Sequence, residues 1–385
     1  MSWKVRLGRN WGRLGMKCKL EEIVNVTMGQ SPKSEYYNTE KNGYPFLQGN
    51  RTFGFKYPTF DTYTTVMTKF AKAGDVIMSV RAPVGALNIT PVDMCLGRGV
   101  CSLRMKNGNQ SFLFYMMKYY VSHLIKKESG TVFGSVNRND INGLEVDIPE
   151  DVEEQKEIAR YLEMIDDKIE LNNAINNNLE QQAQAIFKSW FVDLEPFSNR
   201  KPSDWSVSTL GNVSIMGAGG DKPQNVSPIK TDLYKYPIYS NGLSNEGLYG
   251  FTDKPKISEE SVTVSARGTI GFVCLRHIPY VPIVRLVTLT PKTEIISAKY
   301  LYLWLKQLHI TGTGTTQQQL TVPDFQKTEI LVPSQEIVTL FTATVDPIFE
   351  KIWANQNENE KLSSLRDTLL PKLISGELDV SSIDL

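Results

Sequence analysis

The sequence has 385 residues, no net charge and a hydrophobic content of 41%, which is the composition of an ordinary globular protein with room for two or three domains. No apolar run is long enough to cross a bilayer, and residues 1–6 lack the pattern of a signal peptide, so we expect a cytoplasmic protein without a membrane contact. Four cysteines without CxxC spacing and only three histidines argue against a metal site and for free thiols in a reducing compartment.

The charges are segregated along the chain although they cancel overall. Residues 1–16 and 17–150 each carry a net charge of +4, residues 151–200 carry −6, residues 201–333 carry +3 and residues 334–385 carry −5. Two basic blocks that alternate with two acidic blocks permit local binding of nucleic acid without a basic isoelectric point. The same pattern arises if the helical segments are simply rich in glutamate, and we leave that alternative open here. We assign no role to residues 1–16, which are rich in Trp, Arg and Gly.

Short strands and one apolar helix are predicted in each basic block. Residues 75–80 follow a glycine and read as a strand, and residues 112–125 read as a helix. The second block repeats this order, with strands at residues 261–265 and 284–289 and a helix at residues 298–308. We therefore expect an α+β globular module in each block, residues 1–150 and 200–333.

The chain is an internal duplication. MSVRAPVG at residues 78–85 returns as VSARGTIG at residues 264–271, and LEVDIP at 144–149 returns as TEILVP at 328–333. The offset falls only from about 190 residues to about 183 between the start and the end of the copies, so the repeated unit is half of the chain, far longer than a solenoid repeat. Two similar modules suggest a target that is itself double.

The acidic blocks, residues 151–199 and 334–385, carry heptad seams. The apolar steps of four and three run through Ile158, Leu162, Ile165, Ile169, Asn172, Asn176, Leu179, Ala183, Ile186 and Trp190, and again through Val338, Phe341, Val345, Ile348, Ile352, Asn355, Asn359, Leu362, Arg366 and Leu369. A helix from residue 158 to 190 spans roughly 48 Å. In the second copy we expect a kink or restart at Asp346-Pro347 and an end at Pro371.

Each seam has two asparagines at corresponding places, Asn172 and Asn176 in the first and Asn355 and Asn359 in the second. Asparagine in a helical seam costs stability but fixes register and orientation. We therefore predict that the two helices form a long antiparallel coiled-coil spacer, with the two modules held apart and related by a pseudo-twofold axis. The alternative is that each helix packs on the core of its own module, which is the commoner fate of an amphipathic helix.

The loops of the modules hold the candidate DNA-binding residues. Arg, Lys, Asn and Gln are the side chains that reach phosphates and base edges. Ser79, Arg81 and Gly85 recur as Ser265, Arg267 and Gly271, and an arginine beside a serine after a strand suits either a phosphate contact or an ion pair within the fold. The candidates are Gln30, Lys33, Arg51, Arg81, Lys222, Asn241, Arg267 and Gln317.

Motifs for catalysis are missing from the sequence. It has no GxxxxGK[ST], HExxH or GxSxG motif, and no Asn-Pro-Pro-aromatic or Asp-Pro-Pro-aromatic methylation motif. Three hypotheses of different classes follow, namely a DNA-reading subunit, a stand-alone enzyme acting on nucleic acid, and a purely protein-binding scaffold. Turnover by the purified chain tests the second, and salt-dependent binding to duplex DNA separates the first from the third.

Four stretches of the sequence carry a family resemblance that covers nearly the whole chain. They are MGQSP at residues 28–32, VRAPVG at 80–85, KIELNN running to AIFKSWFVD at 168–193, and LRDTLLPKLISGEL at 365–378. These closely resemble the specificity subunits of type I restriction-modification systems. The resemblance implies two target recognition domains joined by a helical spacer, each reading one half of a bipartite sequence in double-stranded DNA.

The resemblance also implies partners and the absence of an active site in this chain. The helices would dock two methyltransferase subunits, and the assembly would recruit restriction and translocase subunits. No cofactor is then expected on this chain, because S-adenosylmethionine, ATP and Mg²⁺ would belong to the partner subunits.

Overall fold

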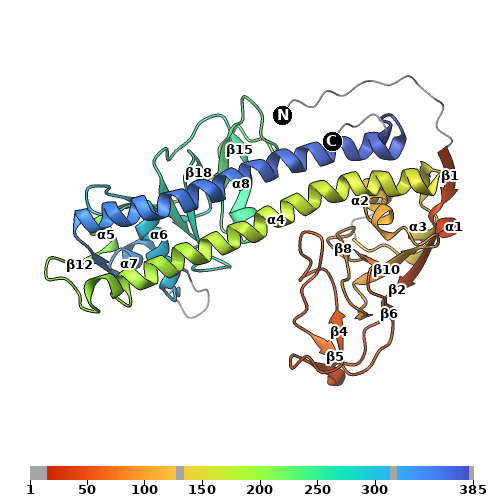
Figure 1. Cartoon of the computed structure of the whole chain (residues 1–385), viewed down its shortest axis with the longest axis horizontal. Coiled ribbons are helices and arrows are strands. Elements are labelled where there is room, and N and C mark those ends of the chain that lie inside the picture. The colour runs from red at the N-terminus through yellow and green to blue at the C-terminus, as the bar shows by residue number, and fades with distance from the viewer. Residues whose placement is uncertain (1–14, 127–133, 313–318, 381–385) are drawn as a thin grey trace. The chain divides into compact units, whose positions relative to one another are not determined.

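The computed structural model describes residues 15–126, 134–312 and 319–380, and the chain divides into two compact units. Unit 1 combines the residues up to Ala174 with those from Asn355 onward, and unit 2 is Ile175–Ala354. Each unit contains one globular domain and part of each of the two longest helices, α4 (Val152–Phe191) and α8 (Gln335–Ser375) (Figure 1). The domain limits at residues 150, 199 and 333 stay a prediction, since the compact units cut through both helices.

Unit 1 combines helices with mostly antiparallel sheets and is the α+β module that the sequence predicts. A four-stranded sheet has the order β2 (Val24–Met28), β10 (Val100–Met105), β7 (Val76–Ser79) and β8 (Leu87–Ile89). A five-stranded sheet has the order β3 (Tyr37–Asn38), β5 (Tyr63–Thr64), β4 (Tyr44–Leu47), β9 (Met94–Leu96) and β6 (Phe70–Ala71). A third sheet pairs β1 (Gly15–Lys19) with β11 (Glu145–Pro149).

The helices of unit 1 are α1 (Leu20–Ile23), η1 (Ser34–Tyr36), α2 (Gln110–Lys126) and α3 (Arg138–Asn142), with the first part of α4 and the last part of α8. The predicted helix at residues 112–125 is confirmed as α2, whose Phe112, Phe114 and Tyr115 are completely buried. Each such side chain removed from water stabilises the domain by about 2 kcal/mol. Apolar residues of α4 and α8 join the same core, among them Leu162 and Leu373.

Unit 2 repeats the two-stranded and four-stranded sheets of unit 1 and has a three-stranded sheet in place of the five-stranded one, so the sequence duplication extends to the core of the fold. Its sheets have the orders β13 (Ser214–Ala218), β19 (Val287–Pro291), β16 (Ser261–Val264), β17 (Val273–Arg276); β15 (Leu248–Thr252), β14 (Tyr236–Tyr239), β18 (Val281–Pro282); and β12 (Ser206–Thr209), β20 (Glu329–Val332). Its short helices are η2 (Glu195–Phe197), α5 (Leu210–Val213), η3 (Ser244–Gly247), α6 (Ala298–Gln307) and α7 (Val322–Phe325). In both units one strand pair is parallel, β4 with β9 and β14 with β18.

One predicted strand begins three residues later than expected. The pattern at residues 284–289 predicts a strand from residue 284, but β19 starts at Val287. Val284 and Arg285 have φ angles of 53° and 60°, which lie in the left-handed region and are incompatible with a strand. The apolar run therefore contains a tight turn that its residue types do not indicate.

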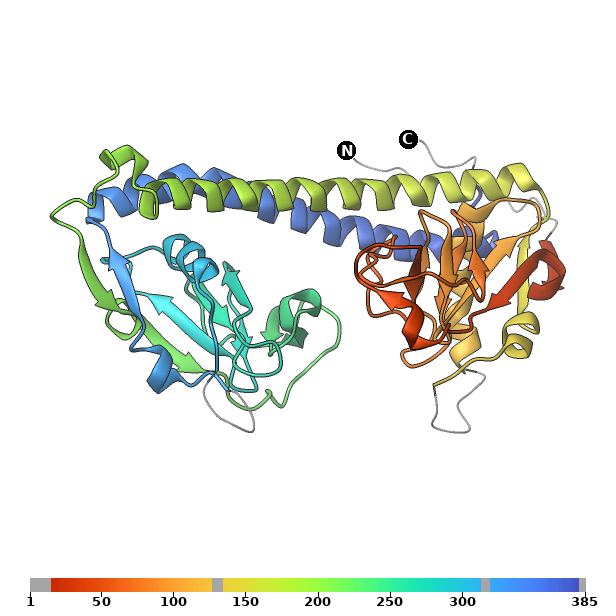
Figure 2. The same ribbon diagram turned by 90° about the horizontal axis from the view of Figure 1, so that it is seen from below.

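Helices α4 and α8 pack antiparallel within each unit (Figure 2). In unit 1 the Asn172 amide donates to Asn359 Oδ1 at 2.9 Å and to Glu358 Oε2 at 2.8 Å, and in unit 2 the Asn176 amide donates to the carbonyl of Ile352 at 3.3 Å. The predicted pairing of the two asparagine-bearing seams is therefore confirmed. The alternative, that the helices pack on the cores of the modules, is also observed. Other apolar residues of α4 and α8 belong to the core of the globular domain in each unit.

Helix α8 does not break where the sequence predicts. It continues through Pro347 and ends at Ser375, beyond the expected end at Pro371. A proline removes one backbone hydrogen bond, but the residues around each proline are buried, with Val345 and Phe349 in the core of unit 2 and Leu370 and Leu373 in the core of unit 1. Packing of the flanking turns keeps the helix intact.

Candidate nucleic-acid interface

Four loops of unit 1 meet at one end of its sheets, and we call them loop cluster 1: residues 28–31, 47–51, 80–85 and 97–99. The Ser31 hydroxyl donates to Gln48 Oε1 at 2.8 Å and accepts the Arg98 amide at 3.1 Å. The Asn50 side chain donates to the carbonyl of Pro83 at 3.4 Å, and the Val80 amide donates to the carbonyl of Gly99 at 2.9 Å. These contacts bring the predicted residues Gln30, Arg51 and Arg81 onto one loop cluster.

The predicted residues of unit 1 differ in how free their side chains are. Gln30, Lys33, Arg51 and Arg81 are all exposed. Arg51 forms a two-pronged ion pair with Asp61 at 2.9 and 2.7 Å, which lowers the pKa of that carboxyl, and Lys33 lies 3.8 Å from Glu35. Arg81 has no side-chain partner among the residues that the structure describes. Exposed ion pairs are weak, so Arg51 and Lys33 remain available to a stronger anion.

Unit 2 has a corresponding group of loops, which we call loop cluster 2: residues 218–222, 240–242, 265–268 and 283–286. Asn241 joins two of them, because its amide nitrogen donates to the carbonyl of Val284 at 2.6 Å and its oxygen accepts the Ala266 amide at 2.7 Å. Arg267 is exposed and donates to Gln319 at 3.0 Å, and Lys222 is exposed. Gln317 lies outside the described residues. Asn241 thus braces the loops, while Lys222 and Arg267 present their charges to solvent.

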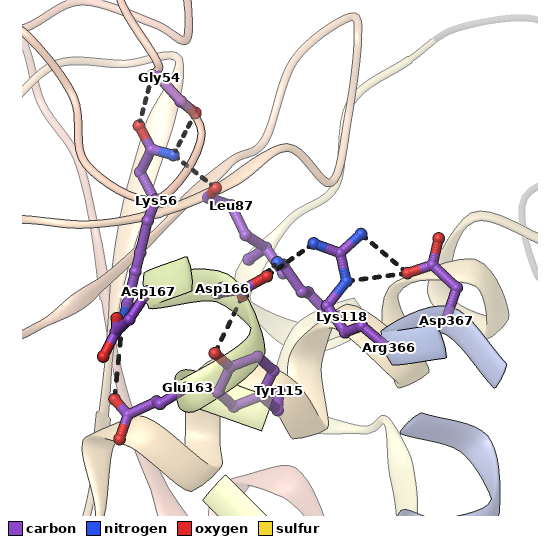
Figure 3. Close-up of polar contacts among 11 residues, drawn as sticks. Gly54, Lys56, Leu87, Tyr115, Lys118, Glu163, Asp166, Asp167, Arg366 and Asp367 are labelled. Carbon is purple, nitrogen blue, oxygen red and sulfur yellow. Dashed lines mark hydrogen bonds and ion pairs between the residues drawn. The ribbon is translucent and has the colours of Figure 1, made fainter. Parts of the chain in front are cut away.

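A buried polar network in unit 1 was not predicted (Figure 3). Asp166 of α4 is completely buried and accepts hydrogen bonds from the Tyr115 hydroxyl at 2.9 Å and from Arg366 Nη1 at 2.7 Å. Lys118 Nζ lies 3.4 Å from the same carboxylate, and burial lowers the pKa of this lysine although Asp166 opposes the shift. The network joins α2 and α4 of the domain to α8.

A second ion pair on α4, made by a buried lysine, holds one loop of the globular domain of unit 1. Lys56 is buried and lies 3.0 Å from Asp167 and 3.9 Å from Glu163, both on α4. The adjacent Phe55 ring lies 5.7 Å from Lys118 Nζ. Lys56 is therefore a structural anchor of the loop at residues 50–57, and a sequence signal for this role is absent because its partners lie about 110 residues away along the chain.

Comparison with known proteins identifies the architecture. A family model described as the type I restriction modification DNA specificity domain matches residues 15–181 and residues 202–364. The chain belongs to this family. The two matched ranges are the two copies of the duplication, each comprising a globular domain and part of the helix that follows it.

Relatives in the family match most of the chain. The specificity subunit of the type I restriction enzyme MjaIX from Methanocaldococcus jannaschii is 26% identical over 95% of this chain and 94% of its own length. The specificity subunit of the type I restriction enzyme HindI from Haemophilus influenzae is 28% identical over 80% of this chain and 88% of its own. The crystal structure of a type I restriction-modification S subunit from M. genitalium superposes with a TM-score of 0.58 at 18% identity, covering 97% of this chain and 99% of that one, which shows a shared fold.

The described residues contain neither a membrane-spanning helix nor a metal-binding group. Across those residues, none of the helices is both long enough and apolar enough to span a bilayer. Within the same ranges, no three His, Cys, Asp or Glu side chains are grouped so that they would hold a metal ion. The exposed groups of the loop clusters are hydrogen-bond donors of the kind that contact phosphates and base edges.

Proposed function

We propose that this chain is the DNA-recognition subunit of a type I restriction-modification complex and that each domain reads one half of a bipartite sequence. The observation that carries the proposal is the duplication at the level of the loop clusters. Two domains with the same core topology each present an exposed arginine, Arg81 and Arg267, at matching places of the repeat. Two modules of the same kind in one chain suit a target in duplex DNA that is made of two half-sites.

The proposal assigns chemistry to partner subunits and not to this chain. Methyltransferase subunits that use S-adenosylmethionine would dock on α4 and α8, and ATP- and Mg²⁺-dependent restriction subunits would join the assembly. The acidic helices support this division, since they need not approach DNA phosphates. A protein that acts on cellular DNA in such a complex would work in the cytoplasm.

Methylation mapping tests the bipartite reading. The chain is expressed with its methyltransferase partner in cells that lack other adenine methylation, and methylated adenines are mapped across the genome. We expect two short sequences separated by a fixed number of unspecified base pairs. Methylation at a single continuous sequence would contradict the proposal, and the unmodified strain supplies the background.

The helices are proposed to set the gap between the two half-sites. Removing one heptad from each helix, residues 171–177 and 354–360, keeps the seam in phase and removes the asparagine positions from both helices together. About 1.5 Å per residue makes each helix roughly 10 Å shorter, so the gap should shrink by about three base pairs while both half-sites stay the same. An unchanged gap, or altered half-sites, would show that the helices do not measure the target.

A further inference from the structure

One tight turn in each recognition domain carries an arginine at its tip. In unit 1 the turn at residues 97–100 joins β9 to β10, and in unit 2 the turn at residues 283–286 joins β18 to β19. The two turns correspond, because the parallel pair of strands that leads into each has the same register, Leu47 opposite Leu96 and Tyr239 opposite Pro282. Arg98 is the second residue of the first turn, and Arg285 is the third residue of the second.

The first turn is fixed by the loops on either side of it. The Gly97 amide donates to the carbonyl of Leu47 at 2.8 Å, and the Gly99 amide donates to the carbonyl of Gln48 at 2.9 Å. A Cβ on either glycine would lie only 2.6 or 2.5 Å from the Gln48 backbone, so no larger residue fits. Arg98, whose amide is held by Ser31, is left as the exposed side chain of a rigid turn.

The second turn is equally fixed, in a strained conformation. The Val284 and Arg285 amides donate to the carbonyls of Gly220 and Gly219 at 2.9 and 2.8 Å, and the carbonyl of Val284 accepts the Asn241 amide. Both central residues have positive φ angles, which a β-branched valine rarely adopts. Backbone strain of this kind persists where the surroundings enforce it and is concentrated at functional sites. Its effect here is to present Arg285 between the loops of cluster 2.

Neither guanidinium has a partner within the described residues. Two arginines that are largely buried are paired with carboxylates, Arg276 with Glu246 at 2.8 Å and Arg366 with Asp166 at 2.7 Å. Arg98 and Arg285 are exposed, and no carboxylate lies within 4.0 Å of either in the part of the chain that the structure describes. Two exposed arginines at neighbouring positions of corresponding rigid turns, each without an internal counter-ion among the described residues, can bind an external anion.

We propose that Arg98 and Arg285, one position apart on corresponding turns, are phosphate contacts, one for each half of the DNA target. This inference rests on the proposed function. Both domains keep the arginine on the same turn although the surrounding loops differ in sequence, and a contact common to two half-sites is a contact to the backbone, which is the same in every sequence. The two residues position the domains on the duplex and leave base reading to the loops that differ.

The test uses the assembled complex with its methyltransferase partner. Binding to a target duplex and to an unrelated duplex is titrated at several salt concentrations for the wild type, Arg98→Ala and Arg285→Ala. Each variant should bind both duplexes roughly tenfold or more weakly, by the same factor for the two. The slope of log affinity against log salt should fall by about one for each arginine removed. Arg98→Lys and Arg285→Lys should keep the wild-type slope.

Matched controls lie outside both loop clusters. Arg160 on α4 and Arg200 after η2 are exposed arginines of unit 1 and unit 2, and their alanine variants should bind DNA as the wild type does. Weaker binding to the target duplex alone, with altered preference at one base pair, would assign Arg98 or Arg285 to base reading and overturn the proposal. Unchanged affinity would also overturn it. If the wild-type complex itself shows no salt-dependent binding, the proposed function fails instead.

Discussion

The contact between α4 and α8 is polar in unit 1 and apolar at the corresponding place in unit 2. With the offset of 183 residues that relates the helices, Asp166 of α4 corresponds to Phe349 of α8, and Ala183 of α4 corresponds to Arg366 of α8. Unit 1 therefore places a buried ion pair where unit 2 places a phenylalanine and an alanine, each among the most buried residues of its core. Phe349 packs against Tyr302 and Trp353 at ring distances of 5.9 and 6.0 Å.

This difference separates stability from selectivity. A buried ion pair is often no more stabilising than the apolar residues that replace it, because removing two charges from water costs about as much as their attraction returns. It does penalise every arrangement in which one charge is buried alone. The seam of unit 1 thus selects α8 as the partner of α4, whereas the seam of unit 2 contributes apolar burial.

The largest expected effect comes from breaking the ion pair on one side. Arg366→Ala leaves the carboxylate of Asp166, which has no exposed surface, with two partners in place of three, and should lower the free energy of unfolding by about 3 kcal/mol. A fourfold variant, Asp166→Phe and Arg366→Ala with Tyr115→Phe and Lys118→Met, removes every member of the polar network, so that no buried donor is left without an acceptor, and should recover most of that loss. Chemical denaturation of the wild type, Arg366→Ala and the fourfold variant measures this, and a fourfold variant less stable than Arg366→Ala would refute the equivalence of the two seams.

A smaller effect is expected in unit 2, where one histidine makes the stability of the protein depend on pH. His277 stacks on Trp353 at 4.1 Å, and burial, with the nearby Lys299 and Arg276 charges, lowers the pKa of His277 to about 4. Between about pH 4 and its ordinary pKa near 6.5, this histidine is neutral when folded and protonated when unfolded, so stability is lost as the pH falls through that range.

The histidine's contribution can be isolated by substitution. After allowance for solvent screening, His277 should account for a loss of about 1–2 kcal/mol in the free energy of unfolding as the pH falls to 4. His277→Phe keeps a ring beside Trp353 but cannot titrate, so its unfolding free energy should fall less than that of the wild type between pH 7 and pH 4. Parallel pH profiles for the two proteins, measured by urea denaturation, would show that His277 does not titrate in this range.

The smallest expected effect concerns the two arginine turns. Val284 is half exposed and has a φ of 53°, a left-handed conformation that glycine adopts without strain. Val284→Gly should raise the free energy of unfolding by less than about 1 kcal/mol, because relief of strain slightly exceeds the entropy that glycine adds to the unfolded chain. DNA affinity should be unchanged, since Arg285 is retained. A marked loss of stability in thermal melting would show that the turn is unstrained.

Much of the architecture was predictable from local signals. The heptad steps and the four seam asparagines predict two long helices and their antiparallel pairing, and Asn172 does contact Asn359. The duplication predicts two modules of one topology. Three of the predicted interface residues, Gln30, Arg51 and Arg81, lie on one loop cluster. It stays a prediction that they contact DNA, and the same holds for Lys33, Lys222, Arg267 and Gln317.

The missed residues depend on contacts that are distant along the chain. Asp166 lies beside Ile165 of the seam, and its sequence context predicts a solvated acid. In the structure, Tyr115 and Lys118 of α2 cover it, and Arg366, which is 200 residues away along the chain, donates a hydrogen bond to it. Arg98 and Arg285 lie beside or within apolar runs, and their significance appears only when the loops around each turn are assembled.

Periodicity and repetition, which are properties of the chain alone, determined the number of modules, the two long helices and the pairing of their seams. Tertiary structure alone decided which charges are buried, which turns are strained and which arginines are free. The physical reason is that periodic burial is encoded by neighbouring residues three, four or seven apart, whereas desolvation and ion pairing depend on whichever segments come together in space.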